Sequence, residues 1–238
     1  MNAAVTLILA AILLDANALK TAPLLTTLPD DGAWVTFQVT AGPQGNEASL
    51  TWTLCSVGTA VYEGKKCRFL ELEQTCDNGP QQIYFYQLRP FVWRVLIPEE
   101  AFGEGKDPLS QTVMSWLKMG DDSPVAVLPG EGPDPILSAI VRGPAANFTT
   151  ESEREKVSWQ QGQLSCSVQS GQGELEFAGS DLKFSFRVLR SNEVPFSIGG
   201  LRQEIKSVFN ETEYKIGINA NLRDHGTRAE PKLPQLTP

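Results

Sequence analysis

Four cysteines give this chain its clearest capacity for covalent chemistry. They are Cys55, Cys67, Cys76 and Cys166, and none forms the C-x-x-C spacing of redox or zinc sites. Because the first 18 residues predict export, these cysteines are disulfide candidates, since disulfides form outside the cytoplasm. We expect Cys55 to join Cys67 across sequential strands, and Cys76 to join Cys166. Free or partly paired thiols are the alternative.

Pairs of acidic residues are the next candidates for chemistry. Asp30-Asp31 and Asp121-Asp122 could contribute to a calcium site or supply catalytic carboxylates. Their Gly and Pro neighbours favour turns instead, and neither pair has EF-hand spacing. Glu71 and Glu73 lie two residues apart on one expected strand and so share a face. We expect that face to be solvated.

Histidine is nearly absent, which excludes several classes of active site. His225 is the one histidine of the chain. Catalytic triads with a histidine base and histidine-rich zinc sites are therefore not expected. The sequence also has no P-loop, no dinucleotide fingerprint and no G-x-S-x-G elbow. We expect no cofactor and no metal; a pair of carboxylates remains a possible hydrolytic site.

Aromatic residues are the candidates for binding an apolar ligand. They lie close together in the sequence on two successive expected strands, with one more on an expected helix. The candidate pocket residues are Tyr84, Tyr86, Phe91, Trp93 and Trp116. On a concave sheet face they would line an apolar pocket. Plain core packing is the alternative reading of the same residues.

The N-terminus predicts export. Residues 3–14 form an apolar run, followed by Ala16-Asn17-Ala18, a triplet typical of signal-peptidase cleavage. The run is too short to span a bilayer, so we expect a signal peptide over residues 1–18 and no membrane span afterwards. A buried or membrane-lying N-terminal helix is the alternative. The net charge of −8, without a basic stripe, disfavours nucleic-acid binding.

Strands dominate both halves of the chain after residue 18. Residues 33–40 alternate apolar and polar side chains, as a half-buried strand does. Turn signals rich in Gly, Pro and Asp separate the segments. The expected strands cover residues 33–40, 49–57, 67–75, 82–88, 91–97, 164–168, 174–177, 182–189, 199–209 and 213–222. We expect hairpin turns at residues 171–173 and 179–181, and a polar link around residues 147–156.

Helical periodicity interrupts these strands once. Asp107-Pro108 is a helix start signal, and Leu109, Val113 and Trp116 fall on one helical face. This predicts an amphipathic helix over residues 108–119 and a shorter one over residues 136–142. The expected fold is α+β, a strongly curved and mainly antiparallel sheet, half-barrel or barrel-like, with a helical insertion packed on it. A sandwich or closed barrel is the alternative.

The expected domain organisation is simple. Residues 19–222 form a single β-rich domain, and residues 223–238, with three prolines and little apolar material, form a disordered tail.

Several phrases resemble a known set of proteins. These are residues 28–35, 66–71, 96–99, 105–109 and 194–196. Together they are similar to uncharacterised exported proteins of planctomycete-type bacteria, and they spread over most of the chain. This resemblance implies one domain and no particular activity. The strand–helix–strand order also resembles the half-barrel of LolA-type periplasmic lipoprotein carriers, as a topological analogy that transfers no site residue.

These observations predict an exported, non-catalytic bacterial protein of the periplasm or the extracellular space. We expect it to bind an apolar or lipid-like ligand or a component of the envelope. A secreted carboxylate-dependent hydrolase and an envelope interaction module without a pocket are the alternatives.

Overall fold

The protein is built around a single large antiparallel sheet. The computed structural model describes residues 24–79, 81–83, 86–103, 106–128, 149–177, 180–209 and 212–234. The strands are β1 (Trp34–Gly42), β2 (Ala48–Tyr62), β3 (Lys65–Cys76), β4 (Gln81–Ile83), β5 (Tyr86–Leu88), β6 (Phe91–Pro98), β7 (Met114–Met119), β8 (Val125–Val127), β9 (Thr149–Trp159), β10 (Gly162–Phe177), β11 (Ser180–Arg190), β12 (Gly200–Phe209) and β13 (Thr212–Gly226). Three short 3-10 helices are η1 (Glu99–Ala101), η2 (Pro108–Gln111) and η3 (Pro195–Ser197).

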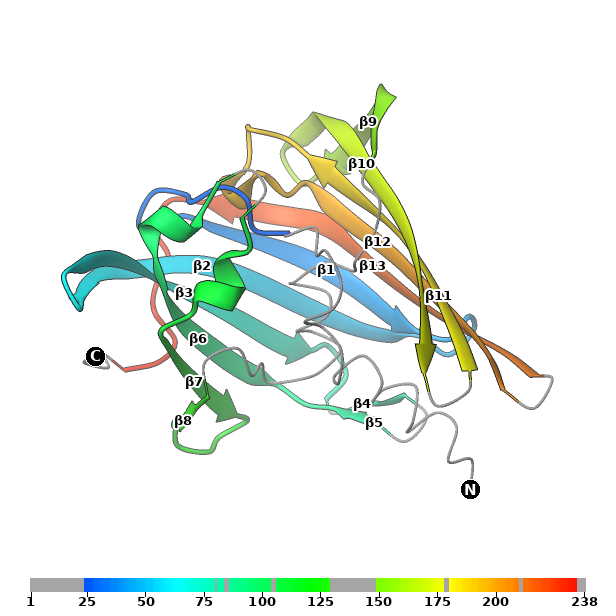
Figure 1. Ribbon diagram of the computed structural model, residues 1–238, viewed down its shortest axis with the longest axis horizontal. Helices are drawn as coiled ribbons and strands as arrows, with labels where there is room; N and C mark the ends of the chain where they lie inside the picture. The colour runs from blue at the N-terminus through cyan, green and yellow to red at the C-terminus, as the bar shows by residue number, and fades with distance from the viewer. Residues whose placement is uncertain are drawn as a thin grey trace.

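Two meanders meet at the centre of the sheet. Eleven strands follow the order β8-β7-β6-β3-β2-β1-β13-β12-β11-β10-β9, and β4 pairs with β5 in a separate sheet of two strands. The first strand, β1, pairs antiparallel with the last, β13. Figure 1 shows these two strands side by side in a sheet that curls and remains open, with β8 and β9 at its two edges.

Alternation along each strand divides the sheet into two faces. On β1, Val35, Phe37 and Val39 are 0, 6 and 0% exposed, whereas the residues between them are half-buried. Successive side chains of a strand point to opposite faces, so these three lie on one side. We call this the inner face, and the opposite face, which carries Glu71 and Arg94, the outer face. The strand expected over residues 33–40 is therefore present as β1.

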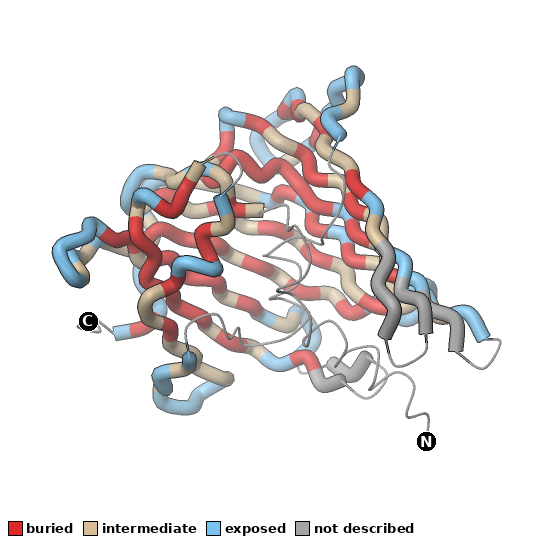
Figure 2. The backbone as a smooth tube through the Cα atoms, viewed as in Figure 1, coloured by how far each residue is buried: buried red, intermediate tan, exposed pale blue. Residues whose placement is uncertain are grey.

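Segments outside the sheet cover the inner face. Leu25, Leu109 and Ile198 are 2, 4 and 2% exposed and join the core cluster of the sheet. Figure 1 shows η1 and η2 lying over the sheet near β1, β2 and β3. Figure 2 shows buried positions recurring along the strands that these segments cover. The core thus lies between the sheet and its short helices and loops.

The predicted α+β class is wrong, because the described residues contain strands and 3-10 turns but no α-helix. Residues 108–119 form η2 and β7 instead of an amphipathic helix. The start signal itself works, since Asp107 accepts a hydrogen bond from the Ser110 N–H at 3.4 Å. The segment then pairs with β6, whose backbone groups need partners along that edge. The second expected helix, residues 136–142, lies outside the described residues.

Two predictions in the second half of the chain are also corrected. Residues 171–173 do not form a hairpin turn, because β10 runs through them without interruption. Residues around 147–156 were expected to be a polar link, yet from Thr149 on they form β9 at the edge of the sheet. A charged strand at an edge lacks the alternating apolar pattern that identifies half-buried strands. The hairpin expected at residues 179–181 joins β10 to β11, with Phe177 paired to Ser180, but residues 180 and 181 already belong to β11.

The disordered tail expected over residues 223–238 is replaced by ordered structure as far as Pro234. β13 continues to Gly226, beyond its expected end at residue 222. After it, the Ala229 N–H donates to the Gly32 carbonyl at 2.7 Å, and Leu233 is only 2% exposed. The segment contains few apolar residues, but hydrogen bonds to its backbone groups fix its position. Residues 235–238 and the expected signal peptide, residues 1–18, lie outside the described residues. In the part of the chain described, no helix is long and apolar enough to cross a bilayer.

Candidate functional site

An apolar cavity lies against the inner face of the sheet. Its walls come from central strands, and its cover comes from the N-terminal segment, η2 and the residue after η3. The lining residues are Leu24, Leu25, Phe37, Trp52, Leu54, Leu70, Glu71, Leu72, Trp93, Val95, Leu109, Ile198, Leu201 and Ala220. Glu71 is the one charged member, and its carboxylate is bonded on the outer face, to Arg94. The cavity therefore presents carbon to whatever enters it.

The cavity is narrow. Its volume is about 50 Å³. Pockets for drug-sized ligands usually measure about 300–1,000 Å³. The cavity consequently suits a thin apolar group, such as a few methylene carbons, rather than a bulky ring system.

Two tryptophans form much of the cavity wall, and hydrogen bonds fix both rings. The Trp52 indole N–H donates to Gln74 Oε1 at 2.8 Å, and the Trp93 indole N–H donates to Ser115 Oγ at 2.7 Å. The Gln74 side-chain amide in turn donates to the Arg89 carbonyl at 2.9 Å. With their polar groups satisfied, the rings offer apolar surface in a fixed orientation.

The N-terminal segment that covers the cavity is held by side chains of the sheet. Arg190 donates to the Leu24 carbonyl at 2.7 Å, and Arg68 donates to the Pro29 carbonyl at 2.9 Å. Burial lowers the pKa of Arg190 to about 10, which still leaves the guanidinium charged near neutral pH. Between these anchors, the Gly103 N–H donates to the Thr26 carbonyl at 3.1 Å. The cover is thus an integral part of the fold.

The aromatic residues predicted to line a pocket lie in different parts of the structure. Trp93 lines the cavity, and Phe91, 3% exposed on the same strand, is core but does not line it. Trp116 lies on β7 opposite Arg94, hence on the outer face, with its ring 6.1 Å from that of Phe69. Tyr84 lies outside the described residues. Tyr86 belongs to β5, and its side chain is likewise outside the description.

Sequence reasoning missed most of the cavity. Most of the residues it overlooked are aliphatic, and the others are Phe37, Trp52 and Glu71. Alternation within the expected strands over residues 49–57 and 67–75 could have placed Trp52, Leu54 and Leu72 on one face. The covering residues Leu24 and Leu25 carried no such signal, because they belong to a segment without secondary structure.

The four cysteines are free thiols in the structure. Cys55 lies opposite Glu71, whereas Cys67 lies opposite Ala60, five positions further along β2. Along β3, Cys67 lies four positions from Glu71, so at about 3.3 Å per residue the two cysteines lie roughly 13 Å apart along the strands, well beyond the 7 Å limit for a disulfide. The expected Cys55–Cys67 pairing therefore does not fit the register. Cys76 and Cys166 are not joined either: five other strands lie between β3 and β10 in the sheet.

Burial also makes these thiols poor nucleophiles. It raises the pKa of Cys55 to about 12, and it raises the pKa values of Cys67, Cys76 and Cys166 as well. Because the thiolate is the reactive form, these side chains are protonated and unreactive near neutral pH. The raised pKa values therefore do not support a catalytic role for any of these four cysteines.

A second, polar groove lies over β9, β10 and β11. It is larger than the apolar cavity, with a volume of about 580 Å³. Its lining residues are Thr149, Glu151, Ser170, Gly171, Gln172, Ser185, Phe186 and Arg187. Hydroxyl, amide and charged groups dominate, so this groove is suited to polar rather than apolar contacts.

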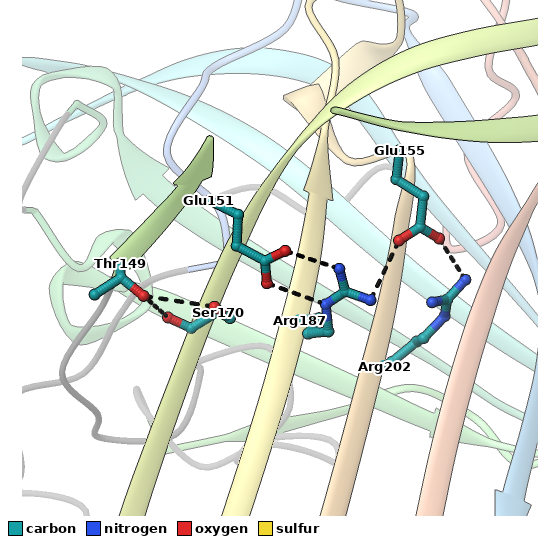
Figure 3. A network of polar contacts seen from close by, with 6 residues as sticks. All are labelled: Thr149, Glu151, Glu155, Ser170, Arg187 and Arg202. Carbon is teal, nitrogen blue, oxygen red and sulfur yellow. Dashed lines mark hydrogen bonds and ion pairs between the residues drawn. The ribbon is translucent and has the colours of Figure 1, made fainter. Parts of the chain in front are cut away.

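A chain of ion pairs runs beside this groove (Figure 3). Arg187 binds Glu151 at 3.0 Å and Glu155 at 3.2 Å, and Arg202 binds Glu155 at 2.6 Å. Arg187 and Arg202 lie directly opposite each other on β11 and β12, an unfavourable placement of like charges. The two glutamates of β9 offset that repulsion. The network thus ties the edge strand to the rest of the sheet.

The acidic residues do not assemble a catalytic or metal site in the described ranges. Asp31 accepts hydrogen bonds from the Gly32 and Gly58 N–H groups, which is the turn chemistry expected of it. No group of three or more His, Cys, Asp or Glu side chains there could hold a metal ion. Among the described carboxyl groups, those whose pKa values shift all shift downward; they are Asp77, Glu99, Glu100, Glu151 and Glu204.

Comparison with known proteins gives only distant likenesses. No family model and no curated protein matches the chain. An inferred exported protein with a YmcC-like fold from Bacteroides fragilis is 9% identical, with a TM-score of 0.36 over 87% of this chain and 100% of that one. An inferred lipoprotein from Parabacteroides distasonis is 6% identical, with a TM-score of 0.36 over 84% and 99%. At these values neither likeness supports an argument about function, and neither bears on the resemblance to planctomycete-type proteins.

Proposed function

We propose that this chain is an exported, non-catalytic protein that binds a narrow apolar group, such as the end of an acyl chain, in the inner cavity. The observation that carries this proposal is the composition of the cavity wall. Thirteen of its fourteen lining residues are aromatic or aliphatic, and the charge of the remaining one, Glu71, is neutralised on the other face. Water gains no hydrogen-bonding partners in such a space, whereas an alkyl chain does not need them.

The energetics favour a thin chain. Each methylene group transferred from water into such a site contributes about 0.8 kcal/mol, so four or five carbons contribute roughly 3–4 kcal/mol. The fixed rings of Trp52 and Trp93 lose no freedom on binding, because their indole N–H groups are already bonded. The rest of a longer ligand would lie outside this cavity.

Export to the periplasm or beyond is proposed from the N-terminus. The apolar run over residues 3–14 and the Ala16-Asn17-Ala18 triplet support a signal peptide that ends at Ala18. Cleavage there leaves Leu24 and Leu25, which cover the cavity, close to the new N-terminus. The mature protein would keep the whole described structure.

The two alternative functions find less support. A glycosidase-like hydrolase needs one carboxyl group with a raised pKa as its acid, whereas the carboxyl pKa values that shift among the described residues are lowered. An interaction module that adds a partner strand needs an accessible edge. β8 has three residues, and β9 carries charged side chains along its length, both of which discourage strand addition.

Mass analysis of the protein exported from its own host tests the proposal. The polypeptide should begin at Leu19, and organic extraction should release a molecule with an alkyl chain in a fixed ratio to protein. An N-terminus at Met1 or Asn2 on the folded protein would contradict export. Protein that begins at Leu19 but carries no apolar molecule, and takes up none when offered fatty acids, would contradict the binding function alone.

A further inference from the structure

The outer face of β3 and β6 holds the C-terminal segment through a buried ion pair. Arg94 binds Glu71 through Nε at 2.8 Å and Nη2 at 2.5 Å. Glu71 also accepts the N–H groups of Lys232 at 2.8 Å and Leu233 at 3.1 Å. Arg94 donates to the carbonyls of Leu233 and Pro234, both at 2.7 Å. Two side chains thus bind four backbone groups of one short segment.

These four hydrogen-bonded groups all belong to the backbone of the segment. The N–H and C=O groups that are bound belong to any extended peptide, so they give affinity without selecting a sequence. Leu233 is 2% exposed, whereas its neighbours Lys232 and Pro234 are exposed. The site therefore buries a leucine side chain at its central position, and the Lys232 side chain adds an ion pair with Glu73 at 3.6 Å.

The segment is attached to the rest of the chain by an exposed connection. Between Gly226 and Lys232, the Ala229 N–H makes one backbone bond, to Gly32, and the side chains are exposed except for the half-buried Ala229. The segment forms no strand pairing with the sheet. It resembles a bound peptide more than a part of the core.

We propose that Glu71 and Arg94 form a peptide-binding site on the outer face, occupied in cis by the chain's own segment from Lys232 to Pro234. The site accepts an extended peptide with leucine at the central position. The ion pair is preformed by strand pairing, since Glu71 and Arg94 are direct partners in the β3–β6 register. The same site binds the same peptide in trans when the covalent tail is removed.

A truncated chain and a free peptide test this site. The chain is ended at Ala229, which keeps the bond to Gly32, and a fluorescein-labelled peptide of residues 230–237 is titrated by anisotropy. The full chain serves as control, because its own tail competes at an effective concentration on the order of millimolar. We expect the truncated chain to bind the peptide at least about tenfold more tightly than the full chain does, and a Leu233→Asp peptide to lose that binding.

Equal binding of the peptide by both chains, or equal binding of the Leu233→Asp peptide, would overturn the proposal. If the truncated chain fails to fold alone, recovery of its circular dichroism on addition of the peptide supports the site. Failure of the peptide to restore the fold counts against it.

Hydrogen exchange on the full chain gives an independent measurement. Glu71→Gln keeps the shape of the side chain but removes the charge that holds the Lys232 and Leu233 amides. Exchange of these two amides should accelerate at least about tenfold, while the Ala229 amide, bound to the Gly32 carbonyl, keeps its rate. Unchanged exchange at Lys232 and Leu233 would show that Glu71 does not hold the segment.

Discussion

Glu71 of β3 and Arg94 of β6 are direct partners in the sheet, and their ion pair is almost fully buried, with side chains 1 and 4% exposed. Their neighbours along the two strands point the other way: Leu72 and Trp93, also direct partners, line the apolar cavity. The same two strands therefore carry a polar site on the outer face and an apolar site on the inner face. This follows from the alternation of side chains in a strand.

Removal of one member of this pair is expected to be costly. Arg94→Met leaves Glu71 as a buried charge without its cation, which should lower the free energy of unfolding by about 3–5 kcal/mol. Arg187→Met is the matched control, because Arg187 is 38% exposed and its ion pairs should contribute about 0–1 kcal/mol. Urea denaturation of both variants measures the difference. Similar losses for the two would contradict the special role of the buried pair.

The cysteines should behave as buried thiols. Because burial raises their pKa values, little thiolate forms at pH 8, and folded protein should react slowly with Ellman's reagent. The half-buried Cys76 should react first, and denatured protein should release four equivalents. Fewer than four equivalents without reductant would show a disulfide and contradict the thiol state described here.

The loss of stability at acidic pH should depend in part on Glu99. Hydrogen bonds from Lys66 and Arg68 hold the pKa of Glu99 below its ordinary value in the folded state. A carboxyl group whose pKa is lowered on folding stabilises the protein above its unfolded pKa, and this contribution is lost as the pH falls through the folded value. Glu99→Gln should therefore destabilise the protein more at about pH 7 than at about pH 3. An equal effect at both pH values would refute this linkage.

Ser115 should contribute more to the stability of the fold than Asp107, which caps η2. Ser115→Ala removes the acceptor of the buried Trp93 N–H and should cost about 1–3 kcal/mol. Asp107→Ala removes a long hydrogen bond at an exposed 3-10 turn and should cost less, on the order of 0.5 kcal/mol. Thermal melts of both variants decide the order. The reverse order would mean that β7 does not pack as described.

Local sequence patterns predict some of these features well. The alternation over residues 33–40 predicted β1 together with its inner-face residues. Turn residues predicted a hairpin close to where Phe177 pairs with Ser180. Trp93 was among the residues expected in an apolar pocket, and it lines the cavity. In each case the determining interactions lie within a few residues of the chain.

Other features depend on contacts between distant residues. Glu71 was expected on a solvated face, but the C-terminal segment, 161 positions away in the sequence, covers it. Residues 114–119 have helical periodicity, yet pairing with β6 makes them a strand. β9 is a strand because β10 folds back onto it, not because of its own composition. A single local window contains none of this information.

Binding of an apolar chain in the inner cavity is tested most directly by energy transfer from Trp52 and Trp93 to cis-parinaric acid, a fluorescent fatty acid. Val95→Phe places a larger side chain in the cavity, whereas Val92→Phe makes the same change on the outer face of the same strand. We predict that wild type and Val92→Phe bind the probe with similar affinity and that Val95→Phe loses at least about tenfold, or 1.4 kcal/mol. If parinaric acid does not bind, or binds folded Val95→Phe as well as wild type, the cavity is not the binding site.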